Sequence, residues 1–392
     1  MDRYPRVTWD EKKLIHNARV LNAICKHHVE WIPVTKSVGA NIEIVDSLYK
    51  QGYRKFADSR LQNLKAIKEY DSSINTCLLR IPGIHEIKDV ITWADCSLVS
   101  EYKVIEALNQ EALSQGKIHH IILMIELGDL REGIMPEELM DIGKHILKFP
   151  AIHWLGIGTN LTCFGGVLPT SDKLAQLVQL KESVEKKLGY HLSVISGGNS
   201  SSLHLLMSGE MPREINHLRL GESLFFGRET AFSKQIPGMH HDIFLLEAEV
   251  IEIKDKPSYP QGIIVKNAFG ETPHFTDKGI RRRAILALGE QDVPLSELTP
   301  VKNGIEIIGG SSDHAILDVT EHHDQIQVGS ILSFQMSYKA LLHAMTSNYI
   351  YKKKINCLLQ NKNTEFCNEK CRAEGKEKKA CQPLTFPLLW KL

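Results

Sequence analysis

Short apolar runs alternate with longer helical patterns over the first 220 residues. The runs rich in Val, Ile and Leu are 29–36, 55–59, 75–81, 96–100, 118–127, 152–160, 192–196 and 216–220. Apolar residues recur with the period of an amphipathic helix at 42–51, 60–70, 102–115, 136–148 and 171–188. Continuous apolar strands that alternate with helices are typical of a parallel sheet covered by helices. Eight such strands predict a closed (β/α)8 barrel of the TIM type.

The pattern changes after Gly227. Strand-like segments now follow one another with few helical stretches between them, at 241–253, 263–267, 283–288, 304–308, 315–319 and 330–334. This spacing predicts a mostly β C-terminal domain. We therefore expect an α/β barrel over residues 1–234 and a β domain over residues 235–350.

The last 42 residues differ from the rest in composition. Residues 351–392 contain ten Lys and Arg, four Glu and four of the eight Cys, whereas the whole chain balances 47 basic against 47 acidic residues. We expect a basic, Cys-containing and poorly ordered tail. The zero net charge of the whole chain argues against a general nucleic-acid-binding protein.

Targeting and metal-binding signals are weak. The chain has no run of 18 apolar residues, which predicts no membrane span, and its charged N-terminus lacks an apolar signal segment. We expect a cytoplasmic protein with reduced thiols. Adjacent histidines such as His119 and His120 point to opposite faces of a strand, so we expect no metal site.

Polar residues with chemical potential follow the predicted strands. In this type of barrel the active site lies at the C-terminal ends of the strands. Lys36 ends the first strand, where partial burial favours the neutral, nucleophilic amine. Gly-Gly-Asn-Ser at 197–200 and Gly221 follow the seventh and eighth strands, the usual phosphate-binding loops of such barrels. The alternatives are a solvent-facing lysine and two ordinary turns. Taken together with Arg219, these features favour pyridoxal 5′-phosphate (PLP).

Six segments carry a specific resemblance. They are VTK at 34–36, ELGDLREG at 126–133, LGIGTNLTC at 155–163, SGGNSSS at 196–202, LRLGE at 218–222 and GSSDHAILD at 310–318. In this order and spacing the chain resembles the fold-type III PLP enzymes of the alanine racemase superfamily, and within it the bacterial ornithine racemases. The resemblance covers residues 4 to about 350 and implies a PLP-dependent isomerase that interconverts L and D amino acids.

The resemblance also implies roles for individual residues. Cofactor contacts would come from Lys36, Asn160, Asn199, Ser200, Ser201, Arg219, Gly221 and Glu222. Lys36 would hold the cofactor covalently and act as one acid/base. Arg219 would face the pyridine nitrogen, and because arginine stays protonated it would keep that nitrogen unprotonated. Such a weakened electron sink favours racemisation over decarboxylation.

The substrate side departs from the family pattern. Arg131 matches the arginine near the substrate carboxylate, with a surface pairing to Asp129 or Glu132 as the alternative. Alanine racemases take their second acid/base, a tyrosine, from the β domain of the partner subunit. Here Glu290 occupies the matching position, and Glu290 and His314 are our candidates for the second acid/base. The alternative is that both are ordinary loop residues and that Glu290 or Asp292 pairs with the distal ammonium group of the substrate.

Acidic residues near this motif favour a basic amino acid, because a cationic side chain needs a counter-charge. The substrate contacts we expect are Arg131, Asp292, Ser312 and Asp313. Ornithine is the favoured substrate, and lysine or alanine are alternatives. A homodimer is implied by the family. Two other functions stay open, a PLP decarboxylase on the same fold and a non-catalytic PLP-binding regulator.

Overall fold

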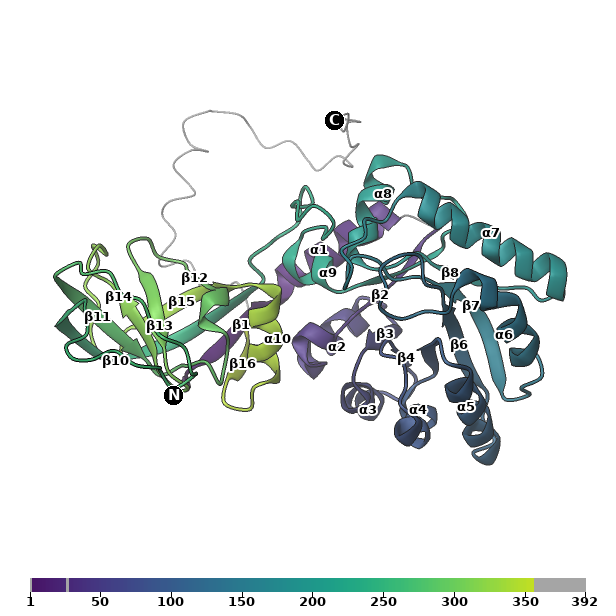
Figure 1. Ribbon diagram of the computed structural model, residues 1–392, viewed down its shortest axis with the longest axis horizontal. Coiled ribbons are helices and arrows are strands. Elements are labelled where there is room, and N and C mark those ends of the chain that lie inside the picture. Colours follow the sequence, from purple (N-terminus) through teal and green to yellow (C-terminus); the bar gives the residue numbers. More distant parts are fainter. Residues whose placement is uncertain (1, 26–27, 356–392) are drawn as a thin grey trace.

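The computed structural model describes residues 2–25 and 28–355, which form two bodies side by side (Figure 1). One contains eight parallel strands in the order β2-β9-β8-β7-β6-β5-β4-β3. A parallel bridge between Val34 and Ala57 joins β2 to β3 and brings the two edges together. The predicted (β/α)8 barrel is therefore confirmed. The expected tail at 351–392 lies outside the described residues from position 356 onward.

The eight barrel strands coincide with the eight apolar runs of the sequence. They are β2 (Glu30–Pro33), β3 (Lys55–Asp58), β4 (Asn75–Leu78), β5 (Cys96–Val99), β6 (His119–Met124), β7 (Ile152–Gly158), β8 (Val194–Ser196) and β9 (His217–Leu220). The helices around them are α1 (Glu11–Cys25), α2 (Ile42–Lys50), α3 (Leu61–Tyr70), α4 (Ile87–Trp93), α5 (Tyr102–Ser114), α6 (Leu139–Ile146), α7 (Ser171–Leu188), α8 (Leu203–Ser208) and α9 (Glu222–Phe226). The strands appear as nearly continuous apolar runs because both of their faces are buried.

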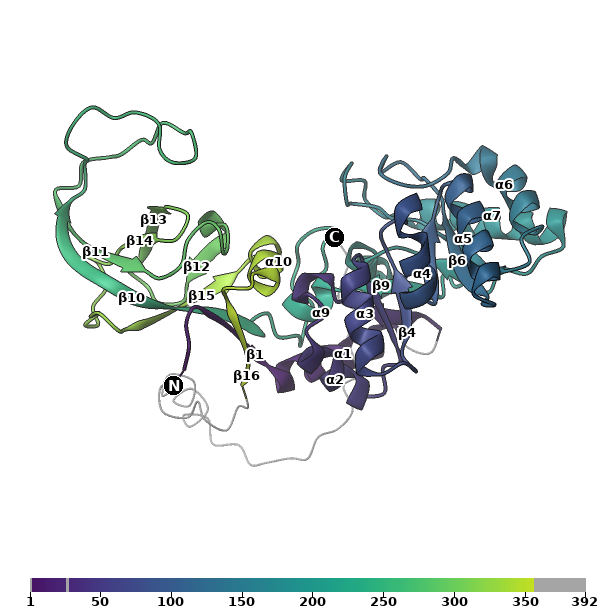
Figure 2. The ribbon, with the colours of Figure 1, turned by 90° about the horizontal axis from the view of Figure 1, so that it is seen from below.

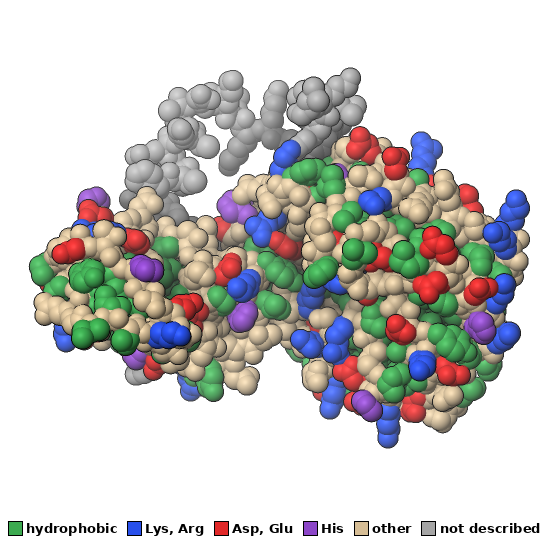
Figure 3. Space-filling model, in the orientation of Figure 1, with side chains coloured by type: hydrophobic (Ala, Val, Ile, Leu, Met, Phe, Trp, Pro, Cys, Tyr) green, Lys and Arg blue, Asp and Glu red, His purple; other side chains and the backbone are tan. Residues whose placement is uncertain are grey.

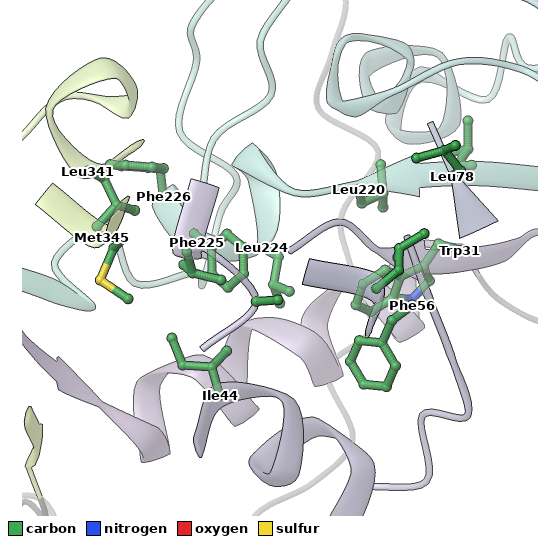
Figure 4. Packing of buried hydrophobic residues seen from close by; sticks show 14 of the residues in the cluster. Trp31, Ile44, Phe56, Leu78, Leu220, Leu224, Phe225, Phe226, Leu341 and Met345 are labelled. Carbon is green, nitrogen blue, oxygen red and sulfur yellow. The ribbon is translucent and has the colours of Figure 1, made fainter. Parts of the chain in front are cut away.

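Two apolar clusters stabilise the barrel. Seven side chains fill its interior: Ile32, Val34, Ala57, Cys77, Leu98, Ile122 and Met124. A much larger cluster lies between the strands and the helices, and Figure 4 shows Trp31, Phe56 and Leu220 within it. The interior is therefore packed with side chains, and a ligand must bind at its mouth.

The second body is built on one sheet, which is antiparallel apart from one parallel pair between residues 6–10 and 351–355. Its strands are β10 (Phe244–Pro257), β11 (Ile280–Leu286), β12 (Leu298–Pro300), β13 (Glu306–Gly310), β14 (Ala315–Asp318) and β15 (Ile331–Met336), together with β1 (Arg6–Asp10) and β16 (Tyr351–Ile355). The mostly β C-terminal domain is confirmed. However, residues 6–10 and 351–355, which we had assigned to the barrel and to the tail, belong to this sheet.

One strand prediction in this domain is wrong. Residues 263–267 form no strand, and the connection 258–279 between β10 and β11 extends away from the sheet (Figure 2). Ile263 is 95% exposed and Val265 is 70% exposed. Local β propensity was high here, but no neighbouring strand pairs with the segment.

A helix that the sequence analysis missed joins the two bodies. α10 (Tyr338–Thr346) begins at Ser337, whose hydroxyl accepts a hydrogen bond from the backbone N–H of Ala340. Figure 4 shows Leu341 and Met345 of this helix beside Phe226 of α9. A Cβ atom at Gly39 would lie 3.2 Å from the carbonyl oxygen of Met345. α10 therefore packs closely against the turn that follows β2.

The described surface and helices give no sign of a membrane-spanning segment or of a metal site. Positive and negative side chains are interspersed over the face in Figure 3. None of the described helices is long and apolar enough to cross a membrane. The described residues also contain no cluster of three side chains that could hold a metal ion.

Candidate active site

A cavity of about 440 Å³ opens at the C-terminal ends of the barrel strands. Eight of the expected site residues line it: Lys36, Arg131, Asn160, Asn199, Ser200, Arg219, Gly221 and Glu222. They come from the ends of five strands that are well separated in the sequence. The fold therefore brings most of the expected site into one pocket.

Lys36 begins the 3-10 turn η1 (Lys36–Val38) directly after β2. The preceding Thr35 is buried and donates a hydrogen bond to the buried carboxyl group of Asp58, 2.7 Å away. Burial raises the pKa of Asp58. The amine of Lys36 has no hydrogen-bond or ion-pair partner within residues 2–25 and 28–355. A partly buried amine without a partner is suited to react with an aldehyde.

The turn after β8 is shaped by one glycine and one asparagine. Gly198 has φ of +115°, and a Cβ atom there would lie 2.7 Å from the hydroxyl of Ser202. Asn199 caps η4 (Ser200–Ser202), since its side-chain oxygen accepts a hydrogen bond from the N–H of Ser201 at 2.8 Å. Gly198 and Asn199 thus define the shape of this turn, and Asn199 and Ser200 line the cavity.

Ser200 links this turn to the one after β9. Its hydroxyl oxygen accepts hydrogen bonds from the N–H and the hydroxyl of Ser223, at 3.1 and 2.6 Å. A Cβ atom at Gly221 would lie 3.0 Å from the carbonyl oxygen of Val34, so only glycine fits without a shift. In the described part of the chain, the N–H groups of Gly221 and Glu222 have no acceptor. This is a cradle for an anion such as a phosphate.

Arg219 lies at the base of the cavity and is 4% exposed. Its guanidinium donates to the hydroxyl of Ser196 and to the carbonyl oxygen of Thr159, the latter at 2.9 Å. No carboxylate pairs with it in the described residues, and burial lowers its pKa. Arg219 therefore directs an uncompensated positive charge into the pocket.

Ser196 also contacts His217, at 2.7 Å from Nδ1. Burial lowers the pKa of His217 to about 3, so the imidazole is neutral near pH 7. Arginine only donates, so the hydroxyl oxygen of Ser196 accepts from Arg219, and the same hydroxyl is the hydrogen-bond partner of Nδ1 of His217. This buried relay fixes the position of Arg219.

Arg131 and Glu132 lie on the loop that follows β6. The guanidinium of Arg131 pairs with both carboxylate oxygens of Glu132. The pairing of Arg131 with Glu132, which was the alternative for Arg131, is therefore present, and both residues also line the cavity. The side-chain amides of Asn160 and Asn199, 2.9 Å apart, connect this loop region to the turn after β8.

Several pocket residues escaped the sequence analysis: Ser37, Leu79, Leu98, Glu132, Thr162, Cys163, Thr230, Ser233 and Tyr338. Tyr338 is the one contributed by the second domain of the same chain, through α10, and burial raises its pKa. The pattern Ser337 followed by an apolar helix was a detectable N-cap signal. The others lie in loops, where a single sequence gives no periodicity.

Six expected residues do not line the cavity of their own chain. Ser201 is fully buried behind the turn. Asp292 is 6% exposed and accepts a hydrogen bond from the N–H of Gly289, so it faces the interior of the second domain rather than a ligand. The other four are on loops of that domain: Glu290, Ser312, Asp313 and His314.

These four side chains are mainly in contact with their own loops. Glu290 accepts from the N–H of Leu295 at 3.4 Å. The hydroxyl of Ser311 donates to the carboxylate of Asp313 at 3.0 Å, and His314 pairs with it at 3.1 Å; both contacts, with a hydrogen bond from Ser312, lower the pKa of Asp313. A role for them in catalysis requires a pocket on another subunit.

Comparisons with known proteins agree with this geometry. The model of the alanine racemase N-terminal domain family matches residues 9–229. A protein named ornithine racemase, from Acetoanaerobium sticklandii, is 45% identical over 351 residues, which cover 89% of this chain and 99% of that protein. The chain belongs to the alanine racemase family.

Other members extend this comparison. A lysine racemase from Thermotoga maritima is 37% identical over 350 residues, covering 89% of this chain and 98% of that protein. The crystal structure of an alanine racemase from Bartonella henselae, with covalently bound pyridoxal phosphate, has a TM-score of 0.69 at 17% identity and covers 90% of this chain and 100% of that one. At that identity the similarity shows the shared fold alone.

Proposed function

We propose that the chain is a PLP-dependent racemase that interconverts the L and D forms of ornithine. The observation that carries this proposal is one pocket in which the unpartnered amine of Lys36 meets the two anion-binding turns at Ser200 and Gly221. The ornithine and lysine racemases, at 45% and 37% identity, support a diamino acid as the substrate.

The residues of this pocket fit PLP. Lys36 would hold it, and the backbone N–H groups of Gly221 and Glu222 with the hydroxyl of Ser200 would bind its phosphate. When bound, PLP supplies an electron sink that stabilises negative charge at the α-carbon of the substrate. Arg219 would face the ring nitrogen, and its positive charge disfavours protonation of that nitrogen. Such a site favours return of the proton over loss of the carboxylate.

Racemisation needs one acid/base on each face of the α-carbon. Lys36 supplies the first. We propose that the second comes from Glu290 or His314 of a partner subunit in a homodimer, because neither residue reaches the pocket of its own chain. We also propose that the protein works in the cytoplasm, since the four described cysteines are free thiols.

The experiment is a comparison of the wild type with Lys36→Ala. The purified wild type incubated with PLP should absorb near the edge of the visible range, and Lys36→Ala should lose this band. Chiral chromatography should then follow conversion of L-ornithine to D-ornithine, with L-lysine and L-alanine in parallel. A wild type without the band refutes the cofactor site, and equal or faster turnover of alanine refutes the diamino substrate.

A further inference from the structure

The loop that carries Arg131 and Glu132 lies at the barrel mouth and is held in shape by its own backbone contacts. Its ends are tied together, because Glu126 N–H donates to the carbonyl oxygen of Ile134 at 2.9 Å and Ile125 pairs with Ile134 in a bridge. The carboxylate of Glu126 accepts from the N–H of Arg131 inside the loop. Gly133 has φ of +143°, where other residues are strained.

A second buried carboxylate, that of Asp129, joins this loop to the loop that follows β7. Asp129 is 0% exposed and accepts from the N–H groups of Cys163, Phe164 and Val167 in the loop after β7, at 3.2, 2.9 and 3.3 Å. Three hydrogen bonds to one buried carboxylate therefore join the two loops. Arg131 and Glu132 are held against the cavity by backbone geometry, not only by their own ion pair.

Two carboxylates line the cavity, those of Glu132 and Glu222, and they differ in whether their cationic partner also lines it. Glu222 pairs with Arg228, at 2.5 and 3.0 Å, and Arg228 is not part of the cavity lining. Glu132 has a single hydrogen-bond partner among the described residues, which is Arg131. The side chain of Glu132 is 14% exposed, so loss of this partner would leave a poorly solvated charge.

Binding of an amino acid disturbs this balance. A substrate carboxylate that pairs with Arg131 competes with Glu132 for the same guanidinium. Glu132 then requires another cation, and a substrate with a second ammonium group brings one. A substrate without that group leaves Glu132 either unpaired or still bound to Arg131, and both outcomes disfavour its binding.

We propose that Glu132 selects diamino acids by pairing with the distal ammonium group of the substrate. This inference rests on the proposed racemase function and deepens it. It places the counter-charge in the barrel of the same chain, whereas the sequence predicts it in the second domain, at Asp292, Asp313 or Glu290. On substrate binding, Arg131 would pair with the substrate carboxylate and Glu132 with its distal ammonium group, in place of their pair with each other.

The test compares L-ornithine with L-norvaline, which has the same carbon chain but no distal ammonium. Glu132→Gln keeps the shape and removes the charge. It should lower kcat/KM for ornithine by roughly 10- to 100-fold, as expected for loss of a charged hydrogen bond, and leave norvaline unchanged or improved. Glu132→Asp keeps the charge and should retain the preference for ornithine.

Glu137→Gln is the matched control, since Glu137 is an exposed residue that does not line the cavity. It should change neither substrate. An equal fall for ornithine and norvaline in Glu132→Gln, or no fall for ornithine, would overturn the inference. The cofactor band of each variant reports an intact site. A wild type that has the Lys36-dependent band and racemises ornithine upholds the proposed function even if Glu132 fails this test.

Discussion

The relay from Arg219 through Ser196 to His217 can be tested by removing its central hydroxyl. In Ser196→Ala the guanidinium of Arg219 loses one neutral acceptor, and Nδ1 of His217 loses its hydrogen-bond partner. Both groups stay buried, because Arg219 is 4% exposed and His217 is 7% exposed. The acceptors that remain for Arg219 are the carbonyl oxygen of Thr159, at 2.9 Å, and the side-chain oxygen of Asn160, at 3.5 Å.

The magnitude follows from the two lost hydrogen bonds. A hydrogen bond to a charged group contributes about 1.5–3 kcal/mol, and a neutral one about 1 kcal/mol. We expect Ser196→Ala to lower the free energy of unfolding by about 3 kcal/mol. The barrel contains a natural control, because the buried hydroxyl of Ser97 contacts Nε2 of His119 at 2.9 Å with no arginine in the pair. Ser97→Ala should cost only about 1 kcal/mol.

Chemical denaturation at pH 7.5 and low salt measures both free energies, and kcat for racemisation gives a second readout. Ser196→Ala should also lower kcat, since an unrestrained Arg219 no longer holds its charge against the cofactor ring. Ser97→Ala should keep kcat. Equal losses of stability in the two variants, or an unchanged kcat in Ser196→Ala, would refute the role of the relay.

Two more predictions concern the pH dependence and the subunit arrangement. Burial lowers the pKa of His119 to about 4 and of His217 to about 3. As the pH falls, these histidines are therefore protonated in the unfolded chain before they are protonated in the folded one. The free energy of unfolding should fall as the pH drops below about 6.5, by about 2 kcal/mol for each histidine at pH 5. Denaturation of His119→Gln at pH 7 and pH 5 should show a loss about 2 kcal/mol smaller than in the wild type, and an identical loss would contradict the assignment. Lys36→Ala can be mixed with the double variant Glu290→Ala, His314→Ala after partial unfolding, so that subunits exchange. Up to roughly a quarter of the wild-type activity should return, because each heterodimer carries one intact site. Activity no higher than the sum of the two variants measured separately would argue against a shared site.

The barrel could be predicted from the sequence because its signal is local. Buried parallel strands such as β6 (HHIILM) and β7 (IHWLGIG) are apolar on both faces, so each is visible without knowledge of its neighbours. The site followed from the fold, since the ends of parallel strands meet at one edge. Lys36 and Gly221 are 185 positions apart in the sequence, yet they line the same cavity.

The features that the sequence did not reveal depend on partners far away in the sequence or on which charged side chains face the cavity. β1 (RVTWD) pairs with β10 and β16, on segments more than 230 residues away, and nothing within its five residues indicates those partners. The opposite error occurred at Ile263 and Val265, where local propensity suggested a strand that no partner supports. Glu132 was read only as a partner of Arg131, because a sequence does not reveal which ion pairs face a cavity.

The ends of the chain also fix the second domain relative to the barrel mouth. β1 runs directly into α1, and the carboxylate of Asp10 caps this junction by accepting from the N–H groups of Lys12 and Lys13 at 2.9 and 3.2 Å. The chain passes from α9 to β10 at a second crossing, and α10 packs on the turn after Lys36 at a third contact. Two covalent crossings and one packed helix leave little freedom for rotation. Tyr338 is therefore held at the cavity, whereas Glu290 and His314 of the same domain do not line it.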